Sequence, residues 1–396
     1  MRLDACGRGA IEPRLLMSAR LAAISLMLGN LVTAMAVLSP AGMLSDLATG
    51  LSVTIRDAGL LMTFGAVVLC FVSPLMVWFT SGIDRRLVLA AMLAILGAGH
   101  FASALAPNYA TLLVVRVLML TMAAAYTPVA ASTIAHLVGE TRRPSAIAFV
   151  FLGWSIAIAA GLPAVTFLAA HVGWRETFAV FGVAAVVVLV MLVASIPPGL
   201  RNPPLSLGSW EAIARQPLVL VLLLITALWT AGQFVVFPYL GPLLSRLAGG
   251  GVEAVGASFA AMGIMGFIGN VVATGIVNRF GAFPTSVVFL SALLIGAAAF
   301  AFGAGSLIVM GMGCAIWGLG FAAFNSMQQV RLVAAAPPLA SATVALNTSS
   351  NYVGQAIGSA LGAELYARDL LYAMGYADVA FMGAALGVLM ASRRLG

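Results

Sequence analysis

The 396-residue chain contains no lysine, and charged residues make up only 8% of it. A soluble domain carries about 25% charged residues and about 45–50% apolar residues, whereas 62% of this chain is hydrophobic. A water-soluble fold could not hide that much apolar surface. We attribute the missing lysine to genome composition, but the scarcity of charge of either sign indicates a protein that lies in a membrane.

Cysteine and histidine are also scarce. Cys6, Cys70 and Cys314 lie far apart and form no C-x-x-C motif, so they predict neither a disulfide framework nor a metal site. The three histidines are widely separated, and the chain has no H-E-x-x-H, no G-x-S-x-G and no nucleotide-binding loop. We therefore expect no catalytic residues, no metal and no cofactor, and the protein is not expected to be an enzyme.

Charged residues divide the chain into long apolar stretches. Gaps such as Arg20 to Asp46 and Glu176 to Arg201 each hold the roughly 20 apolar residues that cross a bilayer. The stretch after Arg20 lacks a clear signal-peptide cleavage site, so we expect it to remain as the first helix. Twelve transmembrane helices are predicted, and the fold class is all-α membrane protein. They begin near Leu21, Gly59, Leu87, Thr111, Ser145, Glu176, Leu218, Val255, Pro284, Leu307, Ala340 and Leu371.

The arginines gather in alternate loops. A net charge of +7 suggests nucleic-acid binding at first sight, but fourteen arginines fall on one side of the predicted membrane and four on the other, with Arg116 inside a span. The positive-inside rule then places both termini in the cytoplasm of a bacterial inner membrane. We expect contacts with membrane lipid and none with nucleic acid.

A proline-rich polar stretch separates two apolar blocks. The expected organisation is a cytoplasmic segment 1–20, a six-helix bundle 21–196, a cytoplasmic linker 197–217, a second six-helix bundle 218–392 and a tail 393–396. A shift of 194 residues superposes Asp84-Arg85 on Asn278-Arg279, a faint internal repeat. The sequence thus favours two pseudo-symmetric six-helix halves.

Several motifs resemble those of the major facilitator superfamily, and more narrowly its bacterial drug and sugar exporters, which are twelve-helix proton antiporters. They are the loop Gly82 to Arg86 after the second span, Arg116 in the fourth, Gly153 with Gly161-Leu162-Pro163 in the fifth, and the junction Gly173 to Phe178. The resemblance covers the whole chain. It implies alternating access around a central cavity, a small-molecule substrate and a monomer.

Two of these motifs are candidate gating elements. Gly82, Asp84, Arg85 and Arg86 can latch the outward-facing state, because glycine allows close helix approach and the acid can accept hydrogen bonds at a neighbouring helix end. The alternative is plain positive-inside anchoring, and the loop departs from its relatives because Arg86-Leu87 follows where a second glycine is usual.

The fifth span carries the other gating candidates, Gly153, Gly161 and Pro163, which predict a bend or a close-packing seam. In relatives, similar motifs mark exporters. Ordinary tight helix packing is the alternative interpretation.

Placing the charge of Arg116 inside a span costs free energy, which favours a functional role. The resemblance implies that this arginine lies in the central cavity. Its alternative is that the long side chain reaches interfacial water, since it lies only about 9 Å from the end of its span. Arginine stays protonated, so it could only bias a neighbouring acid, bond a freed carbonyl or meet an anionic substrate.

The proton-coupling residue is uncertain, because the acid that many relatives carry in the first helix is absent, with Ala34 near its expected place. Besides Arg116, the candidates are Asp378 and His100. Asp378 is an intramembrane acid if the last span begins near Leu371, and lies at the mouth of the bundle if that helix is short and tilted. His100 has a similar interfacial alternative.

Amides and aromatic residues within the spans are candidates for the substrate cavity. Asn347, Asn351 and Gln355 form one helical stripe that a bundle would turn inward. Interhelical hydrogen bonding is the alternative role of each. The full set is Asn30, Arg116, Trp154, Trp229, Gln233, Phe234, Trp317, Asn325, Gln328, Asn347, Asn351 and Gln355.

A cavity with a cation and amides, but without a secure central acid, favours neutral, amphipathic or anionic substrates over cationic drugs. The sequence therefore predicts a secondary active transporter that exports a small organic molecule such as a drug, sugar or nucleoside, by proton antiport. A facilitative uniporter or importer of the same fold is the nearest alternative. A membrane receptor or regulator that transports nothing is a further one.

Overall fold

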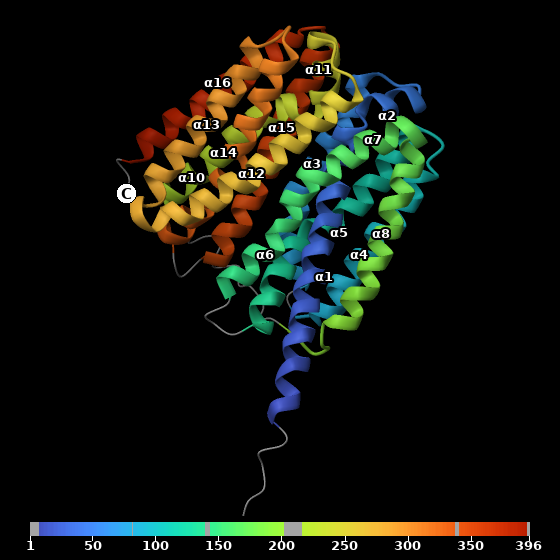
Figure 1. Ribbon diagram of the computed structural model, residues 1–396, viewed down its shortest axis with the longest axis vertical. Helices are drawn as coiled ribbons and strands as arrows, with labels where there is room; N and C mark the ends of the chain where they lie inside the picture. Colours follow the sequence, from blue (N-terminus) through green and yellow to red (C-terminus); the bar gives the residue numbers. More distant parts are fainter. Residues whose placement is uncertain (1–7, 81, 139–142, 202–215, 337–339, 394–396) are drawn as a thin grey trace, which may run out of the picture.

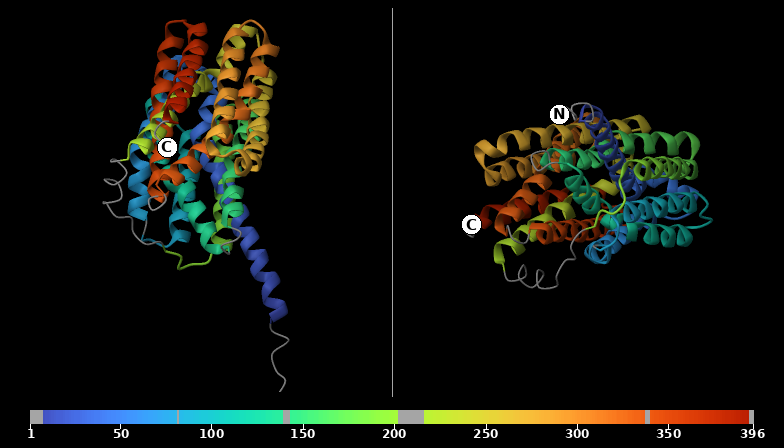
Figure 2. Two further views of the ribbon diagram at one scale, coloured as in Figure 1. Left: turned by 90° about the vertical axis from the view of Figure 1, so that its left-hand side faces the viewer. Right: turned by 90° about the horizontal axis from the view of Figure 1, so that it is seen from below.

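The computed structural model describes residues 8–80, 82–138, 143–201, 216–336 and 340–393. Most of the predicted linker 197–217, and parts of the predicted segments 1–20 and 393–396, lie outside these ranges. The described part contains helices and no strands, grouped into two bundles that lie side by side (Figures 1 and 2).

The N-terminal bundle comprises α1 (Arg8–Gly42), α2 (Leu44–Gly50), α3 (Ile55–Thr80), α4 (Arg85–Ala104), α5 (Tyr109–Leu137), α6 (Arg143–Ile156), the π-helical turn η2 (Ala157–Gly161), α7 (Leu162–Val172) and α8 (Trp174–Ser195). The C-terminal bundle comprises α10 (Pro217–Val236), the 3-10 turn η3 (Phe237–Tyr239), α11 (Leu240–Ala248), α12 (Val252–Phe280), α13 (Ala282–Phe302), α14 (Leu307–Ala335), α15 (Ala340–Ala367) and α16 (Leu371–Ser392).

Eleven helical segments in the described part are long and apolar enough to cross a membrane, with α6 to α7 and α10 to α11 each counted as one. The remaining long helix, α15, has 28 residues, and its amides and hydroxyls make it too polar to qualify by composition. It lies between α10 and α3 and completes the set of twelve. The all-α membrane fold is therefore confirmed, and apart from α1, which starts at Arg8, the helices begin within four residues of their predicted starts.

Close glycine contacts hold α15 against α10. A Cβ at Gly354, Gly358 or Gly362 would overlap the backbone of Ala227, Ala231 or Val235, which advance along α10 in step. In a bilayer, where lipid is as apolar as leucine, such small-residue seams give helices the contact area that holds them together. The two helices therefore run parallel at very short range.

The fifth span packs on α1 in the same way. A Cβ at Gly153 would overlap the backbone of Met27, and one at Gly161 would overlap the side chain of Met35. The same two pairs recur in the C-terminal bundle as Gly354 on Ala227 and Gly362 on Val235, after a shift of about 200 residues. The two bundles thus share one internal design.

The bundles meet at one end, which we name the Arg56 end after the residue near the start of α3. Here Arg56 Nη2 lies 3.1 Å from Glu364 Oε2 of α15, and Thr63 Oγ1 donates to Ser359 Oγ at 2.9 Å. Gly59 leaves room for the hydroxyl of Tyr239, which follows α10. Helices α2 and α11, which also contact each other, lie at this end in Figure 1.

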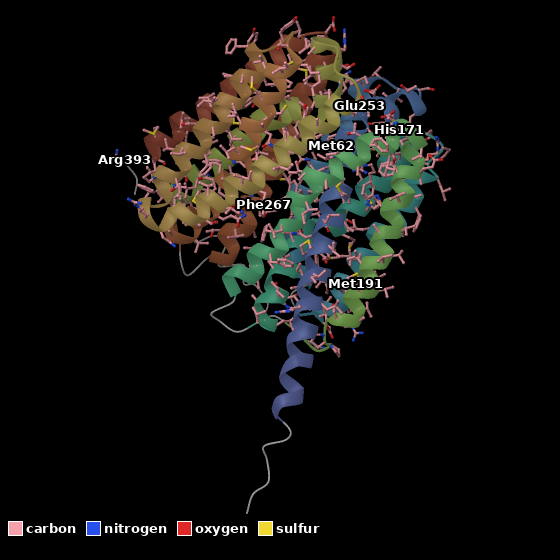
Figure 3. All side chains as sticks on the ribbon, in the orientation of Figure 1. Met62, His171, Met191, Glu253, Phe267 and Arg393 are labelled. Carbon is pink, nitrogen blue, oxygen red and sulfur yellow. The ribbon has the colours of Figure 1, made fainter. Side chains whose placement is uncertain are left out.

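Polar contacts at the opposite end, which we name the Arg85 end, stay inside each bundle in the described part of the chain. Ser25 Oγ and Ser195 Oγ are 2.9 Å apart in the N-terminal bundle, and Arg331 Nη2 donates to Ser392 Oγ at 3.0 Å in the C-terminal one. Apolar side chains fill the interior of each bundle, such as Met62 of α3, which is 1% exposed (Figure 3). The arrangement joins the bundles at the Arg56 end.

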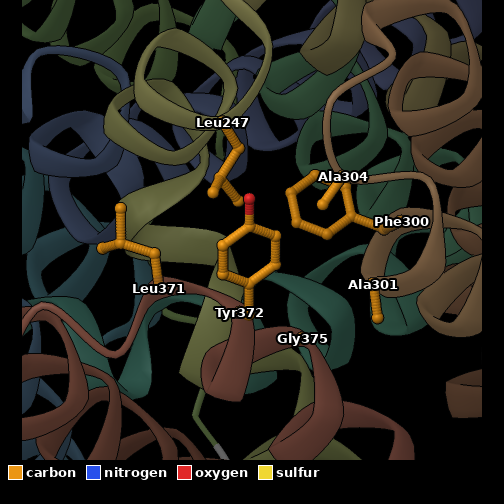
Figure 4. Close-up of a pocket in the computed structure, with 7 residues that line it drawn as sticks. All are labelled: Leu247, Phe300, Ala301, Ala304, Leu371, Tyr372 and Gly375. Atoms are coloured by element: carbon orange, nitrogen blue, oxygen red, sulfur yellow. The ribbon is translucent and has the colours of Figure 1, made fainter.

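A shallow pocket lies on the C-terminal bundle alone, between α11, α13 and α16 (Figure 4). Its lining is mostly apolar: Leu247, Phe300, Ala301, Ala304, Leu371, Tyr372 and Gly375. None of these residues is a predicted site residue, and the pocket has no part in the site described below.

The seam between α15 and α10 predicts the effect of a single methyl group. Gly358→Ala forces the two backbones apart and should destabilise the protein by about 1–3 kcal/mol, as overpacking does elsewhere. The measurement is thermal unfolding of purified protein in detergent. Gly387→Ala on α16, where nothing lies within 4 Å of the new methyl group, is the control and should leave the midpoint unchanged or raise it. Equal midpoints for the two variants would contradict the seam.

Candidate functional site

The amide stripe of α15 is bonded to α10. Asn347 Oδ1 accepts a hydrogen bond from Thr226 Oγ1 at 2.8 Å, and Asn351 Oδ1 accepts one from Thr230 Oγ1 at 2.9 Å. Each pair lies one turn from the next on both helices. Gln355, the third member, is 4% exposed. The oxygens of Asn347 and Asn351 thus serve as interhelical bonds, the alternative that the sequence left open.

Two further amides connect α14 to the same set. Gln328 Nε2 donates to the carbonyl oxygen of Leu222 at 3.0 Å and to Thr226 Oγ1 at 3.2 Å, while its Oε1 accepts from Arg331. Asn325 Oδ1 lies 3.4 Å from the amide nitrogen of half-buried Asn351. Helices α10, α14 and α15 are therefore joined through one polar cluster, which we call the C-terminal polar cluster.

A matching cluster joins three helices of the N-terminal bundle. Asn30 of α1 donates from Nδ2 to the carbonyl oxygen of Val150 on α6 at 3.0 Å, and its Oδ1 accepts from Thr127 Oγ1 of α5 at 2.6 Å. Trp154 Nε1 donates to the same threonine at 3.3 Å. Thr127 and Trp154 are only partly buried, so this N-terminal polar cluster has an accessible side.

Sequence reasoning missed Thr127, Thr226 and Thr230, although each holds a predicted amide. A lone threonine in an apolar helix usually bonds back to the backbone of its own helix, so it does not stand out as a candidate site residue in the sequence. The signal that could have found them is their spacing, since Thr226 and Thr230 are four residues apart, as are Asn347 and Asn351.

The predicted aromatic residues of the C-terminal bundle are buried. Trp229 packs edge-on against Phe321 and Phe324, with ring centroids 5.8 and 5.7 Å away. Trp317 is fully buried on α14, and Phe234 packs against neighbouring Phe237. The indole N–H groups of both tryptophans and the buried Oε1 of Gln233 have no hydrogen-bond partner among the described residues.

Arg116 occupies the interior of the N-terminal bundle. Its side chain is 1% exposed, so it does not reach interfacial water. Its Nη2 donates to the carbonyl oxygen of Ala36 on α1 at 2.6 Å, and its guanidinium lies 5.7 Å from the ring of Phe178 on α8. Pro40, four residues after Ala36, has no N–H to offer that carbonyl. Arg116 therefore satisfies a backbone oxygen that a proline leaves free.

His100 of α4 is buried beside this arginine. Its ring lies between Phe178 and Phe181, with centroids 6.0 and 5.8 Å away, and the charge of Arg116 acts on it. Neither ring nitrogen has a partner among the described residues. The side chain is 0% exposed, so His100 is enclosed by protein, four residues before the end of α4.

Asp378 is also buried rather than placed at the mouth of the bundle. Helix α16 begins at Leu371, and Asp378 on its third turn is 1% exposed. It packs against α10 at Gly232, where an added Cβ would lie 2.8 Å from Asp378 Oδ1. The structure thus places Asp378 in the C-terminal bundle and the pair His100 and Arg116 in the N-terminal one, so the three proton-coupling candidates do not form one cluster.

The loop after α3 is tied to its own bundle. Asp84 accepts hydrogen bonds from the N–H groups of Gly199 at 2.7 Å and Arg86 at 2.9 Å. The Gly199 contact is the main cause that lowers the pKa of the Asp84 carboxyl, followed by the Arg86 N–H and by the charges of Arg201 and Arg86. The carboxylate is therefore held charged at the start of α4, where it also favours the helix N-terminus.

Arg85 is the inward-pointing member of that loop. Its side chain is 4% exposed, and its Nη1 donates to the hydroxyls of Ser132 and Thr133 on α5. Its backbone N–H donates to the carbonyl oxygen of Leu200 at 2.9 Å. Gly82, by contrast, is exposed, and a Cβ added there would have nothing within 4 Å. In this conformation the loop braces α4, α5 and the segment after α8.

The fifth span, where the sequence predicted a bend or a close-packing seam, contains the π-helical turn Ala157–Gly161, which ends two residues before Pro163. Proline cannot donate to the preceding turn, and a π-turn is one way to accommodate the lost bond. Helix α12 of the other bundle packs here, because a Cβ at Gly263 would overlap the backbone of Ala159. The turn therefore touches α1 on one side and the partner bundle on the other.

This architecture and these motifs agree with a comparison to known families, because residues 26–359 match the family model of the Major Facilitator Superfamily. The chain belongs to this superfamily of transporters. The resemblance that the loop, Arg116 and the fifth-span glycines indicated is thereby confirmed at the level of the superfamily.

Curated relatives include an inner membrane transport protein and a probable sugar efflux transporter. The chain is 30% identical to the inner membrane transport protein YdhP of Escherichia coli O157:H7. The alignment spans 346 residues and covers 87% of this chain and 88% of the relative. It is 25% identical over 353 residues to a "probable sugar efflux transporter" of Mannheimia succiniciproducens, with 88% and 87% covered.

Solved transporter structures share the fold. The nucleoside transporter NupG superposes with a TM-score of 0.76 at 13% identity, over 95% of this chain and 99% of that one. A bacterial homologue of the lysosomal transporter Spinster, solved in an inward-facing and unoccupied conformation, superposes with a TM-score of 0.70 at 18% identity, over 96% and 97%.

The role of Arg116 as the partner of Ala36 makes a prediction about Pro40. Pro40→Ala restores an N–H that can bond to the Ala36 carbonyl, so Arg116→Met should then be less harmful. The double-mutant cycle should show an interaction of about 1.5–3 kcal/mol, the range for hydrogen bonds to charged groups. Thermal unfolding in detergent measures it.

The control is Arg175→Met, since Arg175 donates to a different carbonyl, that of Ala106, at 3.1 Å. Its effect should be the same in both Pro40 backgrounds. If Arg116→Met also has the same effect in both, the two residues are not linked through Ala36.

Proposed function

We propose that the protein exports a small, polar, uncharged organic molecule of the sugar or nucleoside class by proton antiport with alternating access. The single observation that carries the proposal is that a hydrogen bond and an ion pair join the two bundles at the Arg56 end, whereas the contacts Ser25–Ser195 and Arg331–Ser392, among the described residues of the Arg85 end, lie within one bundle each. We take the Arg85 end as the side at which the space between the bundles opens.

The distribution of arginine gives this opening a direction. The Arg85 end carries the arginine-rich loops, so we place it, with both termini, on the cytoplasmic side of a bacterial inner membrane. The described conformation is then inward-facing.

The chemistry of the polar clusters supports a hydroxyl-rich, uncharged substrate. Partly exposed groups in them include Thr127 and Trp154 on one side, and Asn325 and Asn351 on the other. Amides and hydroxyls donate and accept hydrogen bonds, and indole rings stack on apolar faces, a combination suited to sugars and nucleosides. The names of the sugar efflux relative and of the nucleoside transporter agree with this class.

Gating follows from the same contacts. We assign the hinge between the bundles to the fifth span, where η2 lies between α1 and α12. The loop Gly82 to Arg86 braces its own bundle in the inward-facing state, and we assign it contacts with the other bundle when the Arg85 end closes. Arg116 is then a structural support of α1 near the site rather than a substrate ligand.

The test is uptake by inverted membrane vesicles, in which the cytoplasmic face is outside. Radiolabelled lactose, arabinose, uridine and chloramphenicol are supplied with and without an imposed pH gradient, acidic inside. The proposal expects at least one of the first three to accumulate several-fold when the gradient is applied, and the collapse of the gradient to release it. Vesicles from cells without the protein set the background.

Each alternative has its own outcome. Flux of a probe that ignores the gradient would replace antiport with facilitated diffusion. Accumulation of chloramphenicol alone would overturn the substrate class. Binding of a probe without any flux would favour a receptor or regulator.

A further inference from the structure

Asp378 is a buried acid without a hydrogen-bond partner at Oδ1 among the described residues. It lies against Gly232 of α10, where an added Cβ would come within 2.8 Å of Asp378 Oδ1 and 3.0 Å of its carbonyl oxygen. Only a glycine leaves space for the carboxyl at this crossing. The carboxyl of Asp378 therefore packs in the space that Gly232 leaves free on α10.

No described cation faces this carboxyl. Helix α16 packs on α10, α13 and α15, and α10 and α13 carry no charged or titratable residue. On α15, Glu364 is paired with Arg56 and Arg368, and Tyr352 and Tyr366 are its other titratable groups.

The remaining groups lie along α16 or at its end. Tyr372 and Tyr376 are exposed, and Arg331 of α14 bonds to Ser392. Ser392 is about 21 Å along the helix from Asp378 at 1.5 Å per residue, too far for Arg331 to pair with the acid. A carboxylate buried without a partner costs several kcal/mol, and a bound proton removes that charge.

The position in the N-terminal bundle that corresponds to Asp378 is not occupied by an acid. Helices α8 and α16 both have 22 residues and both end in a buried serine, Ser195 and Ser392. The eighth residue is Phe181 in α8 and Asp378 in α16. Phe181 fills its place by packing on His100. An apolar ring suits this position, so the acid has a purpose other than packing.

The other two candidates suit a proton site less well. Arg116 stays charged and is bonded to Ala36. A proton on His100 would place a second positive charge next to Arg116 in a buried site. Asp378 has no such neighbour.

We propose that Asp378 is the proton-binding group of the antiport cycle. The neutral acid is the form packed against Gly232 in the closed contact of α16 with α10, and release of its proton to water, which leaves the carboxylate, requires that contact to loosen. Helix α10 continues through η3 to Tyr239, whose hydroxyl meets Gly59 at the Arg56 end. The protonation state is thereby transmitted to the contact between the bundles. This inference rests on the transport function proposed above.

The test needs no substrate. Spin labels on Leu87→Cys of α4 and Phe280→Cys of α12, both exposed at the Arg85 end, report the separation of the bundles in lipid nanodiscs, after each native cysteine is replaced by alanine. Between pH 5 and pH 9 the parent protein should shift its distance distribution. Asp378→Asn, which resembles the neutral acid, should keep the low-pH distribution at every pH.

The matched control is Asp369→Asn. Asp369 is 69% exposed, pairs with Arg246 in the same bundle and has a positive φ that asparagine tolerates. This variant should follow the parent. A pH response of Asp378→Asn equal to that of the parent, or a parent without any response, would overturn the proposal. If Asp378→Asn does not fold, Asp378→Glu decides, because it keeps a carboxyl and should keep the response.

The vesicle assay then separates this inference from the transport proposal. With the probe that the parent accumulates, Asp378→Asn should lose at least tenfold of the gradient-driven accumulation and keep downhill flux. Gradient-driven accumulation at the parent level would overturn the inference while leaving antiport intact. If no probe moves in the parent, the transport proposal fails and the label distances still decide whether Asp378 controls the conformation.

Discussion

A polar group inside a bilayer has no water to bind, so each backbone carbonyl and amide must find its partner within the protein. This constraint explains most of the polar residues in the spans. Arg116 reaches the Ala36 carbonyl that Pro40 leaves without a donor, and Thr226 and Thr230 satisfy the amide oxygens of α15. Asp378 Oδ1 is among the buried atoms without a partner in the described part of the chain, and it belongs to an acid that is charged unless it binds a proton.

The second consequence concerns rigidity. Because the amides and threonines bond within one bundle, and the glycine seams bring α15 onto α10 and the fifth span onto α1, each bundle is a firmly connected unit. Between the bundles, the contacts are concentrated at the Arg56 end and at η2. With the hinge that we propose at η2, two stiff halves can rock while the contacts at the Arg56 end open and close, which is the physical basis of alternating access.

Much of the fold could be predicted from the sequence, because spacing between charges directly reports where the chain can cross lipid. The start of α16 at Leu371 followed from the length that a span needs, but the sequence left open whether Asp378 is buried or lies at the mouth of the bundle. Composition could not show where side chains point. Thr127 went unnoticed because its role is a hydrogen bond to Asn30, a residue on another helix. The link between Arg116 and Pro40 likewise depends on the register of α5 against α1.

The central claim is that the seam at the Arg56 end must open during each transport cycle. Thr63 and Ser359 cross the seam with oxygens 2.9 Å apart, and Ser25 and Ser195 are also 2.9 Å apart but lie within one bundle. Oxidation of Thr63→Cys with Ser359→Cys, in a chain without native cysteines, should stop uptake until a reductant is added, whereas the Ser25→Cys and Ser195→Cys pair should leave uptake unchanged. Full uptake with the cross-seam disulfide formed would contradict the account.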